Sequence, residues 1–233
     1  MKNPFRISGV ILLIILINSC TKEVEYSIKD IDGNDYNTVM IGTQVWMKEN
    51  LKTTKYNDGE TIPLILDGAA WRNLFIEGYC WYENNIADSK EIYGLLYNWH
   101  TVNTGKLCPK GWHVPTDDEW HAMILYLDDS ASLTVYESTT AGDKLKEVGS
   151  TNWPGPNTGA TNESGFTALP GGYRYNNGEF YGFGSFAIWW SSTEDPTNDG
   201  NALIRALTDM DSSVGRSIGC KNDAYSVRCL KNN

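Results

Sequence analysis

Apolar and polar residues alternate with a period of two along several short stretches, which is typical of strands with one buried face. Residues 27–47 alternate on both sides of the turn signal Asp32–Gly33–Asn34 and predict a hairpin followed by another strand. Asn177–Gly178 is a second hairpin signal, between strand candidates 172–175 and 179–183. The other strand candidates are 166–169, 187–191, 202–207, 213–218 and 224–230.

A helical pattern is clearest after Pro115. Thr116 and Glu119 stand at capping-box spacing, and apolar residues then recur on one face, which predicts a helix over 117–127. A second, short helix is predicted over 141–148, ending at Gly149, and another near 69–74. The aromatic block 93–99 fits a strand or a short helix equally well. Few helices and many short strands predict an α+β domain.

The helical and strand patterns both stop in residues 149–166, where Gly, Asn, Thr and Ser dominate. A loop of this length is held by its own hydrogen bonds or by a bound ion. Asn157, Asn162 and Glu163 offer the hard oxygen ligands that calcium prefers, so they form a candidate calcium site. The competing interpretation is that these side chains only cap turns.

The first nineteen residues predict a signal peptide, because Lys2 and Arg6 precede an apolar run, Val10–Ile17, that is too short to span a bilayer. Residues 17–20, Ile-Asn-Ser-Cys, resemble the lipobox of bacterial lipoproteins, so we expect Cys20 to carry the lipid. The charged residues 21–25 resemble a signal for the outer face of the outer membrane. We predict a signal peptide at 1–19, a tether at 20–27 and one domain at 28–231, anchored in the cell envelope. A plain secretory signal is the alternative.

Four cysteines remain after Cys20, and an even number in an oxidising compartment predicts two disulfides. We favour pairing Cys108 with Cys229 and Cys80 with Cys220, because both bonds tie the middle of the chain to its end; the other two connectivities stay open. Zinc is the rival interpretation, but there is no Cys-x-x-Cys pair, and the three histidines show no ligand spacing to the cysteines.

The net charge is −10, and the chain without its first nineteen residues carries −12, which argues against a nucleic-acid partner. Nine Trp and thirteen Tyr on an exported chain suggest stacking on sugar rings or contacts with a protein. The competing interpretation of each ring is that it fills the core. Catalytic motifs such as Gly-x-Ser-x-Gly and His-Glu-x-x-His do not occur, so we expect a non-catalytic module. The candidate ligand-binding residues are Trp153, Tyr173, Tyr175, Tyr181, Trp189 and Trp190.

Seven blocks of the chain, in order, resemble the Fibrobacter succinogenes major paralogous domain family of secreted bacterial proteins. They are IGTQVWM (41–47), YGLLYNW (93–99), GWHVPTDDEW (111–120), NTGATN (157–162), GFTALPGGYR (165–174), WWSSTE (189–194) and YSVRCL (225–230). Together they span nearly the whole chain after the signal peptide.

The resemblance implies a C-type-lectin-like fold, in which two helices pack on short antiparallel strands, the two ends share a sheet, and a long loop region often carries the ligand site. Formylglycine-generating enzymes use this scaffold with a reactive cysteine pair, so Cys220 is the residue to test for such reactivity. The Glu-Pro-Asn, Gln-Pro-Asp and Trp-Asn-Asp triplets of calcium-dependent lectins are absent. A fold-level resemblance does not identify a ligand. We expect a binding module for glycan or protein; the alternatives are a structural role in the envelope and an enzyme related to the formylglycine-generating enzymes.

Overall fold

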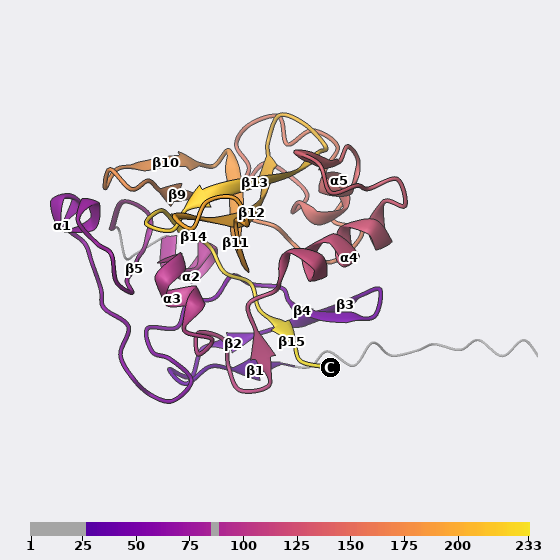
Figure 1. The fold of residues 1–233 in the computed structure, drawn as a ribbon. Helices are drawn as coiled ribbons and strands as arrows, with labels where there is room; N and C mark the ends of the chain where they lie inside the picture. Colours follow the sequence, from indigo (N-terminus) through magenta and orange to yellow (C-terminus); the bar gives the residue numbers. More distant parts are fainter. Residues whose placement is uncertain (1–26, 85–88) are drawn as a thin grey trace, which may run out of the picture.

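The computed structural model describes residues 27–84 and 89–233. The predicted signal peptide, Cys20 and all but the last residue of the predicted tether lie outside this part of the chain. Figure 1 shows a β-rich molecule in which a few short helices lie between and beside the sheets. The helices are α1 (Gly68–Arg72), α2 (Ser89–Tyr93), α3 (Trp99–Asn103), α4 (Asp117–Leu127) and α5 (Ala141–Leu145), with a 3-10 turn η1 at Tyr82–Asn84.

The described strands form four antiparallel sheets. The first is β1 (Ile28–Lys29) with β2 (Asp35–Tyr36). The second has the order β3 (Thr38–Ile41), β4 (Gln44–Met47), β15 (Leu230–Lys231) and β7 (Trp112–His113). The third has the order β10 (Phe180–Phe183), β9 (Gly171–Arg174), β14 (Ala224–Tyr225), β6 (Leu96–Asn98) and β5 (Tyr79–Cys80). The fourth has the order β11 (Phe186–Glu194), β12 (Asn201–Thr208), β13 (Val214–Cys220) and β8 (Tyr136–Ser138).

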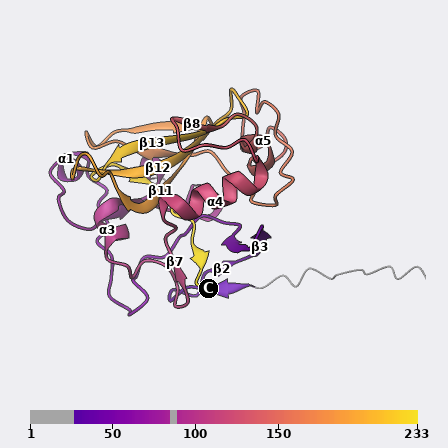
Figure 2. The same ribbon diagram turned by 45° about the vertical axis from the view of Figure 1, so that its right-hand side comes forward.

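Helix α4 confirms the capping-box prediction. The Thr116 hydroxyl accepts the Glu119 N–H, and the Glu119 carboxylate accepts the Thr116 N–H at 2.8 Å. Two of the free N–H groups at the helix start are thereby satisfied, which fixes where the helix begins. Trp120 lies on the buried face, and Figures 1 and 2 show α4 lying along the sheet of β11, β12 and β13.

The predicted fold class is wrong. The structure is mostly β, with four antiparallel sheets and five short helices in the described residues, and it does not have two helices packed on strands. Within residues 27–84 and 89–233, α4 is the only helix longer than five residues. The ends of the domain do share a sheet, since Leu230 pairs with Trp46. The α+β expectation gave too much weight to short helical patterns, which tertiary pairing overrides.

The predicted helix 141–148 shows the reason for this error. It stops at Leu145, because Lys146 leaves the helical conformation and pairs in parallel with Ala168. The Lys146 ammonium is fully buried and donates to the carbonyl oxygens of Thr158 at 2.7 Å, Thr208 at 3.2 Å and Asp211 at 2.7 Å. All three ammonium protons are satisfied by carbonyls, so this side chain ties the loop 149–166 to the end of β12.

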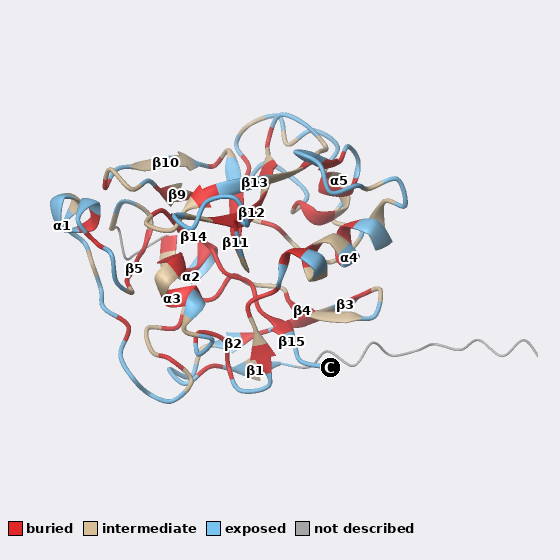
Figure 3. Ribbon diagram, in the orientation of Figure 1, coloured by how far each residue is buried: buried red, intermediate tan, exposed pale blue. Residues whose placement is uncertain are grey.

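Large aromatic side chains fill the core, which Figure 3 shows as buried segments of the inner strands. Trp46, Trp120, Trp189 and Phe166 are all at most 1% exposed, and the rings that contact one another have centroids 4.7 to 6.0 Å apart. The guanidinium of Arg228 lies 4.0 Å from the centre of the Phe166 ring, and it donates to the Asn50 side chain and to the Phe166 carbonyl. Burial lowers the pKa of Arg228 to about 9.

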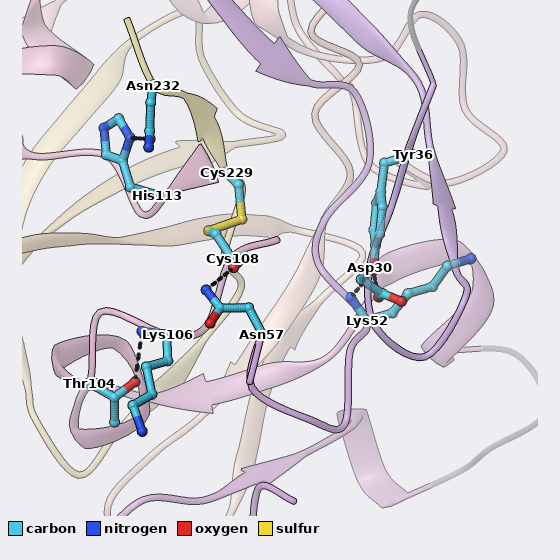
Figure 4. Close-up of a disulfide and its surroundings, with 10 residues drawn as sticks. All are labelled: Asp30, Tyr36, Lys52, Asn57, Thr104, Lys106, Cys108, His113, Cys229 and Asn232. Carbon is cyan, nitrogen blue, oxygen red and sulfur yellow. Dashed lines mark hydrogen bonds between the residues drawn. A yellow bond between two sulfur atoms is a disulfide. The ribbon is translucent and has the colours of Figure 1, made fainter. Parts of the chain in front are cut away.

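Cys108 and Cys229 form a disulfide with 6.0 Å between their α-carbons, across 121 residues of sequence (Figure 4). Asn57 donates to the Cys108 carbonyl beside it at 2.9 Å. This confirms one favoured pairing. The other is wrong in this structure: Cys80 is a buried free thiol between β6 and the α1 region, and Cys220 is a half-buried free thiol at the end of β13. Burial raises the pKa of the Cys80 thiol to about 12, which makes it unreactive.

Candidate functional site

The hairpin formed by β9 and β10 brings together three of the predicted ligand-binding residues. Its turn follows the Asn177–Gly178 signal: the Gly178 N–H donates to the Tyr175 carbonyl, and the Tyr175 N–H donates to the Glu179 carbonyl. Gly178 adopts a φ of +88°, a left-handed conformation that suits glycine. The turn fixes the register, so that Tyr173 pairs directly with Tyr181.

Tyr173, Tyr175 and Tyr181 form a cluster on this hairpin, which we call the tyrosine hairpin. The ring centroids of Tyr173 and Tyr181 are 5.9 Å apart and tilted by 33°, while Tyr175 stands edge-on to Tyr181 at 6.3 Å. Tyr181 is 39% exposed and Tyr175 43% exposed, and Tyr173 is half-buried beside them. Neighbouring rings with free faces are the arrangement that stacks on sugar rings and apolar groups.

Polar groups lie beside the tyrosine hairpin. The Tyr181 hydroxyl donates to the Glu179 carboxylate at 2.6 Å, and the Asn177 side-chain amide donates to the Tyr181 oxygen at 3.1 Å. Glu179 is exposed and Asn177 is half-buried. A carboxylate and an amide next to exposed rings can hydrogen-bond a ligand's hydroxyls while the rings contact its apolar faces.

Arg174 points to the opposite face of the hairpin and makes it rigid. Its buried guanidinium donates to the carbonyl oxygens of Ile65 at 2.7 Å, Leu66 at 3.0 Å and Gly178 at 3.0 Å. The same group lies 4.6 Å from the centre of the Trp71 ring of α1. These contacts hold the hairpin, whose turn lies near α1 in Figure 1, and so fix the position of the strands that carry the tyrosines.

A chain of aromatic rings connects the tyrosine hairpin to the core. Tyr173 is 5.6 Å from Tyr225, and Tyr225 is 4.7 Å from the buried Trp190. Below them, the buried Asp223 accepts hydrogen bonds from the Asn176 N–H, the Cys220 N–H and the Tyr225 hydroxyl. Burial raises the pKa of Asp223 to about 6, because the interior disfavours its charged form. The exposed rings therefore rest on a packed support.

The other predicted ligand-binding rings are core residues. Trp153 and Trp190 have no exposed surface, and Trp189 has 1%. The indole N–H of Trp153 donates to the Ala168 carbonyl, that of Trp190 to the Tyr97 carbonyl, and that of Trp189 to the Asn50 side chain. These rings are not placed to contact a ligand, and for them the core interpretation is the correct one.

The loop residues predicted as calcium ligands are engaged within the loop. The Asn157 amide donates to the carbonyls of Glu147 and Gly149, and the Asn162 side chain accepts the Thr167 N–H at 2.8 Å. Glu163 is exposed. In the described residues no group of three or more His, Cys, Asp or Glu side chains is arranged to hold a metal ion. Calcium at this loop stays a prediction.

The sequence reasoning missed Asn177, Glu179 and Asp223. The first two carried a usable signal: once Asn177–Gly178 sets the turn, the period of two puts Glu179 on the same face as Tyr181 and Tyr175. Asp223 gave no such signal, because it approaches the hairpin only through the pairing of β14 with β9.

Two hollows lie elsewhere on the described surface. One, of about 260 Å³, lies beside the disulfide loop and is lined by residues such as Ile28, Ile31, Leu107 and Lys110. The carboxylate of Asp30, which also lines this hollow, already accepts hydrogen bonds from Asn34 and, at 2.6 Å, from the Tyr36 hydroxyl. The second, of about 340 Å³, lies between α4 and the turn before β4. Neither contains a predicted site residue.

Comparisons with known proteins bear on the family. The family model of the Fibrobacter succinogenes major domain matches residues 39–231. The comparison with curated proteins and the comparison with solved structures give no match. Among the described residues, no helix has the length and apolar character needed to cross a membrane. Because the match covers well over half of the sequence, this chain belongs to the Fibrobacter succinogenes major domain family.

Proposed function

We propose that this protein is a lipid-anchored protein of the cell envelope whose tyrosine hairpin binds glycans without catalysing a reaction. The observation that carries the proposal is the pair of exposed rings of Tyr175 and Tyr181, with Glu179 and Asn177 within hydrogen-bond distance of the Tyr181 hydroxyl. Sugars present apolar ring faces and hydroxyl edges at the same time, and this surface offers a partner for each.

Rigidity also supports binding at this place. The hairpin is held from behind by Arg174 and from below by the ring chain through Tyr225, so little conformational entropy is lost when a ligand binds. Exposed rings at a flexible loop tip would lack this advantage.

A screen of the mature domain on a glycan array, run with and without calcium, tests the proposal. We expect binding to a restricted set of glycans in both conditions, because the tyrosine hairpin uses no metal. Binding that requires calcium would indicate that the ligand binds at the loop of Asn157 and Asn162 and not at the tyrosine hairpin. A domain that binds no glycan in either condition, yet captures a specific protein, would overturn the proposal.

The anchor is tested separately through Cys20. We expect the full-length protein to sediment with membranes and to incorporate a labelled fatty acid, since acyl chains on Cys20 hold it there. Cys20→Ser is expected to remove both the label and the membrane association, while Cys220→Ser, a matched substitution in the folded domain, keeps both. Labelling that persists in Cys20→Ser would contradict the anchor.

A structural or assembly role in the envelope is the second candidate, and one observation favours it. Phe75 and Ile76, which follow α1, are 71% and 59% exposed. Apolar side chains of this size on a surface are typical of protein contacts when they gather into a patch. Phe75→Ser combined with Ile76→Ser is expected to leave glycan binding unchanged, and loss of an envelope partner in that variant would support the second candidate.

A further inference from the structure

We infer that the tyrosine hairpin selects neutral glycans and rejects acidic ones. This inference rests on the proposed function and specifies the chemistry of its ligand. It concerns the charge around the exposed rings, which the family match does not address.

The acidic groups at the hairpin have no cationic partner among the described residues. The Glu179 carboxylate receives its hydrogen bonds from neutral donors, the Tyr181 hydroxyl at 2.6 Å and the Asn177 amide at 3.4 Å. Asp223, behind Tyr173, is likewise bonded only to N–H groups and to the Tyr225 hydroxyl. A ligand that contacts the Tyr181 ring therefore meets a carboxylate that makes no ion pair with the described residues.

Three cations from segments that contact the hairpin or Asp223 have other partners. Arg174 is buried on the opposite face and bonded to three carbonyls. Arg72, on α1, donates to the Asn177 carbonyl at 3.1 Å. Lys221 pairs with Glu194 at 3.3 Å and lies 4.4 Å from the centre of the Trp99 ring. Among the described residues, none of the three forms an ion pair with Glu179 or Asp223.

Repulsion between like charges discriminates against a partner even where its shape fits. A carboxylate of a uronic acid within several ångströms of Glu179 is expected to weaken binding roughly threefold to tenfold at low salt. The net charge of −10 on the whole chain acts in the same direction at longer range.

Affinity electrophoresis of the mature protein in gels containing matched polysaccharides tests the inference. One pair is hydroxyethyl cellulose with carboxymethyl cellulose, and the other is methyl-esterified with de-esterified polygalacturonan; within each pair the backbone is shared and the charge differs. We expect retardation by the neutral member of at least one pair and little by its anionic counterpart. Stronger or equal retardation by the anionic member would overturn the charge selectivity and leave glycan binding standing. Retardation by neither member of either pair, together with an array that shows no glycan binding, would overturn the proposed function itself.

Substitution of Glu179 distinguishes the effect of this carboxylate on binding from the effect of the net charge of the whole chain. Glu179→Gln keeps an oxygen acceptor for the Tyr181 hydroxyl and removes the charge, so we expect roughly threefold to tenfold tighter binding to the anionic polymer at low salt. Asp129→Asn removes one exposed negative charge after α4 and serves as the control, with an expected change of less than twofold. Equal gains in both variants would overturn the assignment of selectivity to Glu179.

Discussion

At the scale of single residues, the buried Asp223 is expected to make the stability of the fold depend on pH. Its pKa is raised to about 6 by burial, against an ordinary value of 3.8, so the folded protein binds this proton more tightly than the unfolded chain. The stabilising contribution is therefore complete below about pH 4 and is lost as the pH rises through 6. Its size is at most about 3 kcal/mol.

Urea unfolding at pH 4.5 and pH 7.5 tests this assignment. Other carboxylates with lowered pKa values, such as Asp117 and Asp128, lose stabilising interactions in acid, and this loss masks the gain in stability from protonated Asp223. The wild type is therefore compared with Asp223→Asn at each pH. We expect wild-type stability relative to this variant to be higher at pH 4.5 than at pH 7.5. A difference between the two proteins that does not change with pH would show that Asp223 does not titrate in this range.

Residue identity alone did not separate binding rings from core rings. Trp153, Trp190, Tyr175 and Tyr181 are all large aromatic residues, yet the first two are buried and the last two exposed. An indole N–H that finds a carbonyl, as in Trp153, lets the whole ring be buried. Such carbonyls come from distant segments, which a sequence pattern does not reveal.

At the scale of elements, a buried ion network joins α4 to the fourth sheet. Arg205 on β12 contacts Asp117 at 2.6 Å and Glu137 at 2.5 Å, and all three side chains are nearly inaccessible. Arg216 also pairs with Asp117 at 2.8 Å, and His121 lies 2.5 Å from Glu137. Removing one member of a buried network leaves an uncompensated charge, which costs more than the pair itself contributes.

We predict that Arg205→Met lowers the free energy of unfolding by about 3–5 kcal/mol at pH 7, measured by urea unfolding. Arg216→Met is the matched control: this side chain is 26% exposed, and Asp117 keeps Arg205 as a partner, so the loss should be clearly smaller. Equal losses in the two variants would contradict a special role for the buried pair.

Elements were predictable where their signal is local. The Thr116–Glu119 capping box predicted the start of α4, and Asn177–Gly178 predicted the hairpin of β9 and β10. The helix predicted over 141–148 failed, because Lys146 satisfies three carbonyls of other segments and so leaves the helix. Local propensity is a weak guide when a buried charge requires partners from elsewhere.

At the scale of the whole molecule, the order of strands in the sheets could not be predicted from the sequence, because strands such as β14 and β15 contain only two residues each. Their partners are set by long-range pairing, β14 with β6 and β9 and β15 with β4 and β7. Cysteine parity predicted two disulfides, and we favoured pairings that join the middle of the chain to its end. Cys108–Cys229 confirms one of them. The pairing of Cys80 with Cys220 is wrong, because both are free thiols in the structure.

The disulfide closes 121 residues of sequence, so its loss should matter to the whole fold. We predict that Cys108→Ala with Cys229→Ala lowers the free energy of unfolding by about 2–5 kcal/mol. Cys220→Ser, at a half-buried free thiol, should cost less than about 1 kcal/mol. Thiol labelling of the unreduced, unfolded domain by mass spectrometry gives a second check, and labelling of neither Cys80 nor Cys220 would contradict the observed pairing.

The central claim is that the exposed rings of the tyrosine hairpin contact the glycan. Its most direct test is the dissociation constant of the best glycan from the array, measured by calorimetry for three proteins. They are the wild type, the double variant Tyr175→Ala with Tyr181→Ala, and Tyr136→Ala, whose tyrosine is 68% exposed on β8 in a different sheet.

We predict at least about tenfold weaker binding in the double variant and unchanged binding in Tyr136→Ala, with all three proteins showing cooperative thermal unfolding. Unchanged affinity in a folded double variant, or an equal loss in Tyr136→Ala, would contradict the assignment of the binding site to this hairpin.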